Sequence, residues 1–161
     1  MNRTVRRALG RLRGDADGAE RGNAVVEFLG VALVLLLPVM YLVLTVGRVQ
    51  AATFAVEGAS REAARAYVTA PSAADGARLA SVAVALAFGD QGFGTAASGG
   101  ALTLTCSASP CLEPGGEVTA HVRLDVPLPL VPSFVRSAVP LSVPVEARHV
   151  ASVDEYAGRR S

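Results

Sequence analysis

The sequence predicts an α+β fold, in which a long N-terminal transmembrane and stalk helix precedes a small domain of one helix and a three-stranded antiparallel sheet. Residues 28–47 are apolar and uncharged, residues 48–68 carry apolar side chains at helical spacing, and three later stretches alternate between apolar and polar residues. Steps of three and four residues are typical of helices, whereas a period of two is typical of strands. Apart from the leader and the apolar run, the 161-residue chain has enough residues for one small domain.

The apolar run from Phe28 to Gly47, FLGVALVLLLPVMYLVLTVG, predicts a membrane-spanning helix. At ~1.5 Å per residue, twenty such residues match a hydrocarbon core of ~30 Å. A cleavable secretory peptide has a shorter apolar region followed by a small-residue cleavage site. A buried helix of a soluble protein is the alternative, but such helices rarely lack a polar face over this length. Pro38 within the run predicts a mild kink.

The charges that flank this run predict its orientation. Arginines cluster before it, and only Arg48 follows closely. The clustered residues are Arg3, Arg6, Arg7, Arg11, Arg13 and Arg21. Because basic residues stay on the cytoplasmic side, we expect a single-pass cell-membrane protein with a cytoplasmic N-terminus. The expected parts are a leader (1–22), a transmembrane helix continuing as a stalk (23–68) and an extracytoplasmic α+β domain (69–161).

The stalk carries a narrow stripe of small apolar side chains. Its members are Val49, Ala52, Val56, Ala59, Ala63 and Ala66. Such a stripe would let another backbone approach closely, as helix packing in membranes often does. Composition bias and the high helix propensity of Ala explain the same residues equally well.

A second helix is expected after Pro71, which ends the first. Asp75 is its expected N-cap, and the helix itself is expected from Ala77 to Phe88. Its expected apolar side carries Leu79, Val82, Leu86 and Phe88. The glycine-rich stretch 89–100 is expected to be a flexible loop, because no G-K-[ST] sequence follows that would indicate phosphate binding.

Three alternating stretches predict the strands of the sheet: 101–107, 118–126 and 141–150. Pro140 and Pro144 favour an edge position for the third. Between the second and third strands, the apolar, proline-rich residues 126–134 are expected to form a loop. This loop either covers the core or offers a contact surface.

The two cysteines of the chain, Cys106 and Cys111, lie on the side expected to be exported, where a disulfide is expected. Their C-x4-C spacing differs from a C-x-x-C redox motif, and two cysteines without nearby histidines make a poor zinc site. A bridge across so short a loop is expected to hold the turn that connects two strands.

The remaining polar residues predict no catalytic, cofactor or metal site. His121 and His149 fall in expected strands, and no serine lies in a G-x-S-x-G elbow. Glu113, Glu117 and Asp125 follow no calcium-binding or paired-carboxylate pattern. The net charge of +1 gives no sign of nucleic-acid binding. We therefore expect a protein that is not an enzyme and that binds no nucleic acid and no small-molecule substrate.

An acidic residue, Glu27, stands at the start of the apolar run, in R-G-N-A-V-V-E-F from Arg21 to Phe28. A carboxylate there is disfavoured unless it has a partner, although a place at the headgroup boundary near a helix N-terminus would also accommodate it. If the bond after Gly22 were cut, the new amine of Asn23 would lie one helical turn from Glu27. In a bundle of such helices, each amine could then pair with a neighbour's carboxylate.

These residues resemble the TadE/TadG-like pseudopilins of tight-adherence (Flp-type) pilus assembly. The resemblance covers roughly residues 21–68: G-N-A-V-V-E-F after a basic leader, the apolar helix, the G-R pair at Gly47 and Arg48, and A-S-R-E-A-A-R-A from Ala59 to Ala66. It implies that a prepilin peptidase cleaves between Gly22 and Asn23. It also implies that Glu27, followed by Phe28, serves recognition or assembly.

Three hypotheses about function follow. The first is a non-catalytic minor pseudopilin or assembly component, whose partners are the membrane bilayer, other pilins or pseudopilins, pilus-assembly proteins and a prepilin peptidase. The second is a signal-anchored extracytoplasmic module that binds another envelope protein or a ligand and never enters a pilus. The third and least favoured is a membrane-tethered hydrolase.

Overall fold

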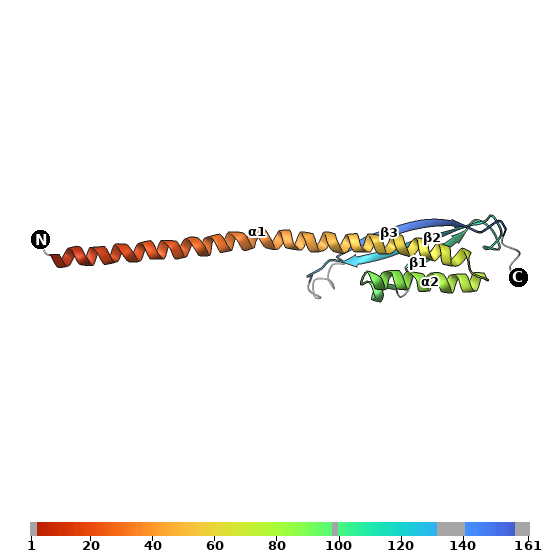
Figure 1. The fold of residues 1–161 in the computed structure, drawn as a ribbon, viewed down its shortest axis with the longest axis horizontal. Helices are drawn as coiled ribbons and strands as arrows, with labels where there is room; N and C mark the ends of the chain where they lie inside the picture. Colours follow the sequence, from red (N-terminus) through yellow and green to blue (C-terminus); the bar gives the residue numbers. More distant parts are fainter. Residues whose placement is uncertain (1–2, 98–99, 132–140, 157–161) are drawn as a thin grey trace. The chain divides into compact units, whose positions relative to one another are not determined.

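The computed structural model describes residues 3–97, 100–131 and 141–156, and it describes side chains from Ala24 onward except at residues 96 and 97. In chain order it contains α1 (Arg3–Val68), α2 (Ala73–Asp90), the short 3-10 helix η1 (Gly94–Ala97), β1 (Leu102–Cys106), β2 (Glu117–Pro127) and β3 (Ser142–Ser152) (Figure 1). The expected α+β class is confirmed. The chain divides into two compact units, Met1–Val43 and Leu44–Ser161.

Helix α1 ends at Val68, as the sequence predicts, but it begins at Arg3 and so includes the arginine-rich segment. At its C-terminal end the backbone N–H of Thr69 donates to the carbonyl of Arg65 at 3.2 Å. The Thr69 hydroxyl donates to the same carbonyl at 2.9 Å. These bonds satisfy an acceptor that a helix end leaves open, and Pro71 follows where the helix has stopped.

The sheet belongs to the second unit and has the order β1-β2-β3, with both pairs antiparallel. Leu104 lies opposite Ala120, and Leu124 lies opposite Val145. Every second residue of the central strand is buried: Val118, Ala120, Val122, Leu124 and Val126. The period of two therefore marks one face that packs against helix, and β3 takes the edge position that its prolines favour.

The core of the second unit consists mainly of Ala and Val side chains. The C-terminal part of α1 contributes Ala52, Ala55, Val56, Ala59, Ala63, Ala64 and Tyr67 to the cluster that also holds the buried face of β2. Phe88 of α2 is the largest of the fully buried side chains. The small-residue stripe does permit a close approach, but within this unit it packs against the chain's own sheet and second helix.

Helix α2 begins four residues before its expected start, and its N-cap is Ser72 rather than Asp75. The N–H of Asp75 donates to Ser72 Oγ at 3.1 Å, and that hydroxyl donates to Asp75 Oδ2 at 2.9 Å. Hydrogen bonds from Ser72 and then from Arg78 lower the pKa of the Asp75 carboxyl. The prediction that Asp75 caps the helix was wrong, because the serine three residues earlier forms a reciprocal pair with it.

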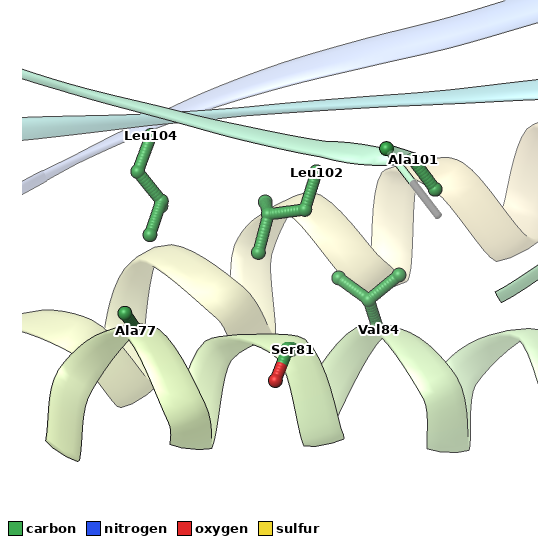
Figure 2. Close-up of a pocket in the computed structure, with 7 residues that line it drawn as sticks. Ala77, Ser81, Val84, Ala101, Leu102 and Leu104 are labelled. Carbon is green, nitrogen blue, oxygen red and sulfur yellow. The ribbon is translucent and has the colours of Figure 1, made fainter. Parts of the chain in front are cut away.

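The buried side of α2 also differs from the expected one. Leu79, Val82 and Leu86 are exposed by 38%, 48% and 64%. The buried positions are Gly76, Ala80, Val84 and Phe88, a strict four-residue repeat. Val84 faces β1 near Leu102 (Figure 2). Three of the four expected core positions were therefore wrong, because small residues allow a closer approach than leucines do and decide which side packs inward.

Gly76 of α2 packs closely against Tyr67 of α1. A Cβ atom at this position would lie 3.0 Å from Tyr67 Cδ2 and 3.1 Å from the Tyr67 carbonyl oxygen, whereas a Cβ at Gly89 of the same helix would meet nothing within 4 Å. Gly76→Ala and Gly89→Ala gain the same helix propensity, so we expect Gly76→Ala to be less stable than Gly89→Ala by about 1–3 kcal/mol. Urea unfolding of both variants in detergent checks this, and equal stabilities would contradict the close contact.

Candidate functional site

The apolar run of α1 presents its side chains outward. Phe28, Val34 and Leu35 are exposed by 70%, 70% and 65%. The stretch Ala24–Val68 is long and apolar enough to cross a membrane. None of its most apolar 18-residue segment is buried within the chain. The run is therefore not a core helix of this chain, which was the alternative considered from the sequence.

The four residues assigned to processing and assembly all lie in α1. Gly22 and Asn23 fall within the helix, but their side chains lie outside the described part of the chain. Glu27 and Phe28 are exposed. Where side chains are described, Glu27 has no ion-pair partner. The roles of these four residues stay predictions.

Arg48, the first charge after the apolar run, connects α1 to the loop that follows α2. Its Nη2 donates to the Gly92 carbonyl at 3.2 Å. Its guanidinium lies 4.0 Å from the centroid of the Phe93 ring, and this ring is buried. A cation over an aromatic face adds to the attraction of the hydrogen bond. Sequence reasoning identified Arg48 only as a flanking charge, since no local pattern links it to a residue 45 positions later.

Two of the cavities among the described residues border the helices. The first, about 340 Å³, lies between α2 and β1 and is lined by Ala77, Ser81, Val84, Gly100, Ala101, Leu102 and Leu104 (Figure 2). Its one hydroxyl, on Ser81, already donates to the Arg78 carbonyl at 2.7 Å. Binding pockets usually combine apolar walls with several convergent polar groups, which this cavity does not offer.

The second cavity lies between the end of α1 and β3. It is lined by Arg61, Glu62, Arg65, Val68, His149, Val150, Ala151 and Ser152. Arg61 and Glu57 on the same helix lie 3.9 Å apart and are largely exposed. This cavity is an open polar groove where the edge strand meets the helix.

The two histidines lie on opposite faces of the sheet. His149 pairs with Ala120 on the helix-facing side, whereas His121 pairs with Thr103 and Arg148 on the other side. His121 Nε2 lies 3.4 Å from Glu146 Oε2. A hydrolase would need a nucleophile beside such a pair. No hydroxyl contacts His121 among the hydrogen bonds of the described residues.

The acids singled out in the sequence are also dispersed. Asp125 Oδ1 lies 3.6 Å from Nη2 of its neighbour Arg123 on the exposed face of β2. Glu117 is the first residue of β2, and Glu113 lies in the loop that connects β1 to β2. Over the described ranges, no group of three or more His, Cys, Asp or Glu side chains is placed to hold a metal ion.

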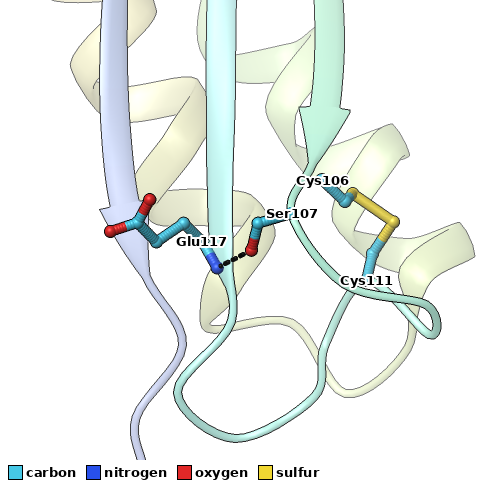
Figure 3. The surroundings of a disulfide bond; sticks show 4 residues. All are labelled: Cys106, Ser107, Cys111 and Glu117. Carbon is cyan, nitrogen blue, oxygen red and sulfur yellow. Dashed lines mark hydrogen bonds between the residues drawn. A yellow bond between two sulfur atoms is a disulfide. The ribbon is translucent and has the colours of Figure 1, made fainter.

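Cys106 and Cys111 form a disulfide, as the sequence predicts, with their Cα atoms 5.3 Å apart. The bridge closes the loop that leaves β1 at Cys106 (Figure 3). Beside it, the N–H of Ser107 donates to the Glu117 carbonyl at 2.9 Å, and the N–H of Glu117 donates to Ser107 Oγ at 2.8 Å. The disulfide thus holds the connection between β1 and β2.

Gly116 in this loop ties the end of β3 to it. The N–H of Val153 donates to the Gly116 carbonyl at 2.8 Å, and the N–H of Gly115 donates to the Val153 carbonyl at 3.2 Å. A Cβ at Gly116 would lie 2.9 Å from the Glu113 carbonyl oxygen, closer than side chains normally come. The turn therefore requires glycine at this position.

No family model, curated protein or solved structure matches this chain. Its architecture is pilin-like. A long apolar N-terminal helix leads into a second helix and a three-stranded antiparallel sheet that packs against the C-terminal part of the long helix. Function must therefore be argued from the surfaces and residues of the chain itself.

Proposed function

We propose that this chain is a non-catalytic, single-pass membrane protein that acts as a TadE/TadG-like minor pseudopilin or assembly component of a tight-adherence-type pilus or secretion system. The observation that carries the proposal is the exposed apolar run of α1, which continues as one helix into a small disulfide-bonded α+β domain. The membrane bilayer, other pilins or pseudopilins, pilus-assembly proteins and a prepilin peptidase are its partners.

The exposed side chains support a lipid or helix environment for the apolar run. Leucine and valine side chains dominate residues 28–47, and most are more than half exposed. Their transfer out of water is favourable at about 25 cal/mol per Å² of apolar surface. The arginines before the run favour a cytoplasmic N-terminus, and the disulfide fits an oxidising compartment for the rest.

In this proposal, the apolar run makes the lateral contacts with other subunits, and the small-residue stripe does not. Ala52, Ala59 and Ala63 are fully buried within the chain's own domain. Glu27 and Phe28 are exposed at the start of the run, so the carboxylate can pair with the amine of a neighbouring helix in low dielectric. The proposed assembly thus uses α1 twice, with its N-terminal part for subunits and its C-terminal part for the fold.

Co-purification of Glu27→Gln and Glu57→Gln variants tests this assignment. Both variants remove one carboxylate from α1, and Glu57 makes only a weak pair with Arg61 at 3.9 Å. From membranes of cells that hold the assembly machinery, we expect the unaltered chain and Glu57→Gln to bring down pilins or assembly proteins. Glu27→Gln is expected to lose them, because an amide cannot pair with a neighbour's charged amine.

The intact mass of the same purified chains reports on processing. When a prepilin peptidase is present, we expect the mass of a chain that begins at Asn23. When it is absent, we expect the mass of a chain that begins at Met1. A Gly22→Leu variant, whose side chain obstructs the proposed cut, should start at Met1 in both. An N-terminus at Met1 throughout would reject cleavage. Recovery of the same partners by Glu27→Gln would reject the role of Glu27, and recovery of only unrelated envelope proteins would favour the binding-module alternative.

A further inference from the structure

The outer edge of β3 is open to a further strand. Among the described residues β3 pairs only with β2, so its other side has no neighbour in the sheet. Just before β3, the Leu141 carbonyl accepts from Leu128, and just after it, the Val153 N–H donates to the Gly116 carbonyl. In an antiparallel pair, alternate residues direct both backbone groups to the partner strand. Odd-numbered residues of β3 therefore bond to β2, and even-numbered residues direct their N–H and C=O groups to the open edge.

Pro144 confines the usable part of this edge to the second half of β3. Proline has no N–H, and at an even-numbered position the missing donor falls on the open edge. The even-numbered residues after it each present an N–H there: Glu146, Arg148, Val150 and Ser152. Within the described part of the chain, none of them forms a backbone hydrogen bond outside the sheet. An extended chain can bond to such a row without rearrangement of the strand.

The same half of β3 borders the open polar groove at the end of α1, which has a volume of about 470 Å³. Arg61, Glu62 and Arg65 line it from the helix, and His149 lines it from the strand. Arg61 is held only weakly by Glu57 at 3.9 Å, and over the described ranges Arg65 has no ion-pair partner. The lining thus sets two guanidinium groups against one carboxylate. Because guanidinium groups bind carboxylates with good geometry, the groove favours an acidic side chain.

Towards Pro144, the helix-facing side of β3 is apolar and incompletely covered. Val145 and Ala147 are half-buried, whereas the residues opposite them on β2 are buried. Every second side chain of an added strand would lie on this same face. Those opposite Ala151 and His149 would reach the groove, and those opposite Ala147 and Val145 would cover the apolar surface. The edge therefore fits a segment with acidic and then apolar residues at alternate positions.

We propose that the open edge of β3 binds an extended segment of another protein, which adds to the sheet as an antiparallel strand and places acidic side chains against Arg61 and Arg65. Antiparallel pairing gives the slightly stronger ladder. A second copy of this chain does not supply the acid, since the helix-facing side chains of its own edge strands are Val, Ala and His in β3 and Leu and Cys in β1. The inference concerns only the unit Leu44–Ser161, so it goes beyond the proposed membrane role and does not depend on it.

A synthetic peptide, Thr-Glu-Thr-Glu-Thr-Val-Thr-Val-Thr, tests the proposal. It is blocked at both ends, carries an uncharged fluorophore, and is titrated with the full chain in uncharged detergent micelles while fluorescence anisotropy is recorded. We expect binding to the unaltered chain and about tenfold weaker binding to the Arg61→Gln, Arg65→Gln double variant. Arg78→Gln with Arg123→Gln is the matched control, because it removes the same charge from α2 and from the exposed face of β2. This control should bind like the unaltered chain.

A change in the peptide covers the case in which the double variant disturbs the fold. A peptide with Gln in place of both Glu should bind the unaltered chain about tenfold more weakly. If the unaltered chain does not bind the acidic peptide, or if the control pair weakens binding as much as the groove pair does, the proposal is overturned. Equal binding of the acidic and amide peptides would overturn it as well.

Methylated peptides test the backbone part of the proposal. In antiparallel pairing, the threonine N–H groups point to β3, and those of Glu and Val point away. A methyl group on the nitrogen of the central Thr should therefore abolish binding, and one on the nitrogen of the next Val should leave it unchanged. The same effect from both methyl groups would overturn strand addition. Light scattering of the chain alone tests the other occupant: a dimer that the peptide separates would mean that a second copy occupies the edge, which contradicts the proposed partner.

Discussion

Phe88→Ala is expected to lower the free energy of unfolding of the domain by about 3–5 kcal/mol. Phe88 is fully buried, and the core cluster to which it belongs consists mostly of Ala and Val side chains. Side chains this small cannot extend into the space that the ring leaves, so the cavity stays largely open and its lining loses contacts. Urea unfolding of the full chain in detergent, followed by circular dichroism, measures the loss.

Leu86→Ala is the matched control for this experiment. It shortens an apolar side chain two residues earlier on α2, where Leu86 is 64% exposed. Surface substitutions usually change the free energy of unfolding by no more than about 0.5 kcal/mol. The control should therefore unfold at nearly the same urea concentration as the unaltered chain. A larger loss from Leu86→Ala than from Phe88→Ala would mean that Leu86 packs inward and would contradict the arrangement of α2 described above.

Local patterns were sufficient to predict most of the elements. The period-two stretches gave three strands, since a half-buried strand must alternate, and Pro71 marked the end of α1 because proline cannot continue a helix. The inward side of α2 was mispredicted for a different reason. This helix is apolar over much of its surface, so its periodicity does not select one side, and the choice depends on Gly76 fitting against Tyr67. That contact joins two elements and leaves no trace in either segment alone.

The candidate site divides in the same way. Glu27 and the apolar run could be identified from sequence because a carboxylate beside twenty uncharged residues is energetically unusual. The contact of Arg48 with Gly92 and Phe93 could not be identified from sequence, because it depends on α2 returning antiparallel along α1.

In the sequence, Leu130 was only one residue of an apolar loop, residues 126–134, for which two interpretations were open. Its exposure and positive φ are properties of the folded turn. Residues 132–134 of that loop lie outside the described ranges.

The apolar run is the other place where a substitution should have a very large effect. Leu35→Arg combined with Leu36→Arg places two charges at the centre of the run, where each arginine costs roughly 2.5–3.5 kcal/mol of insertion free energy. Leu79→Arg combined with Val82→Arg adds the same charge to the exposed side of α2. We expect the first pair to release the chain from membranes under alkaline carbonate extraction and the second pair to leave it in the membrane pellet.

The mass of the retained protein decides what kind of apolar segment the run is. A cleaved secretory peptide and a permanent anchor both need an apolar helix for insertion, and two arginines would disturb either one. Only a permanent anchor leaves residues 28–47 in the protein that remains with the membrane. The pelleted Leu79→Arg, Val82→Arg control should therefore have a mass that includes this run, whether its N-terminus is Met1 or Asn23. A pelleted protein that begins beyond Gly47 would contradict a spanning α1, because the domain would then hold to the membrane without its helix.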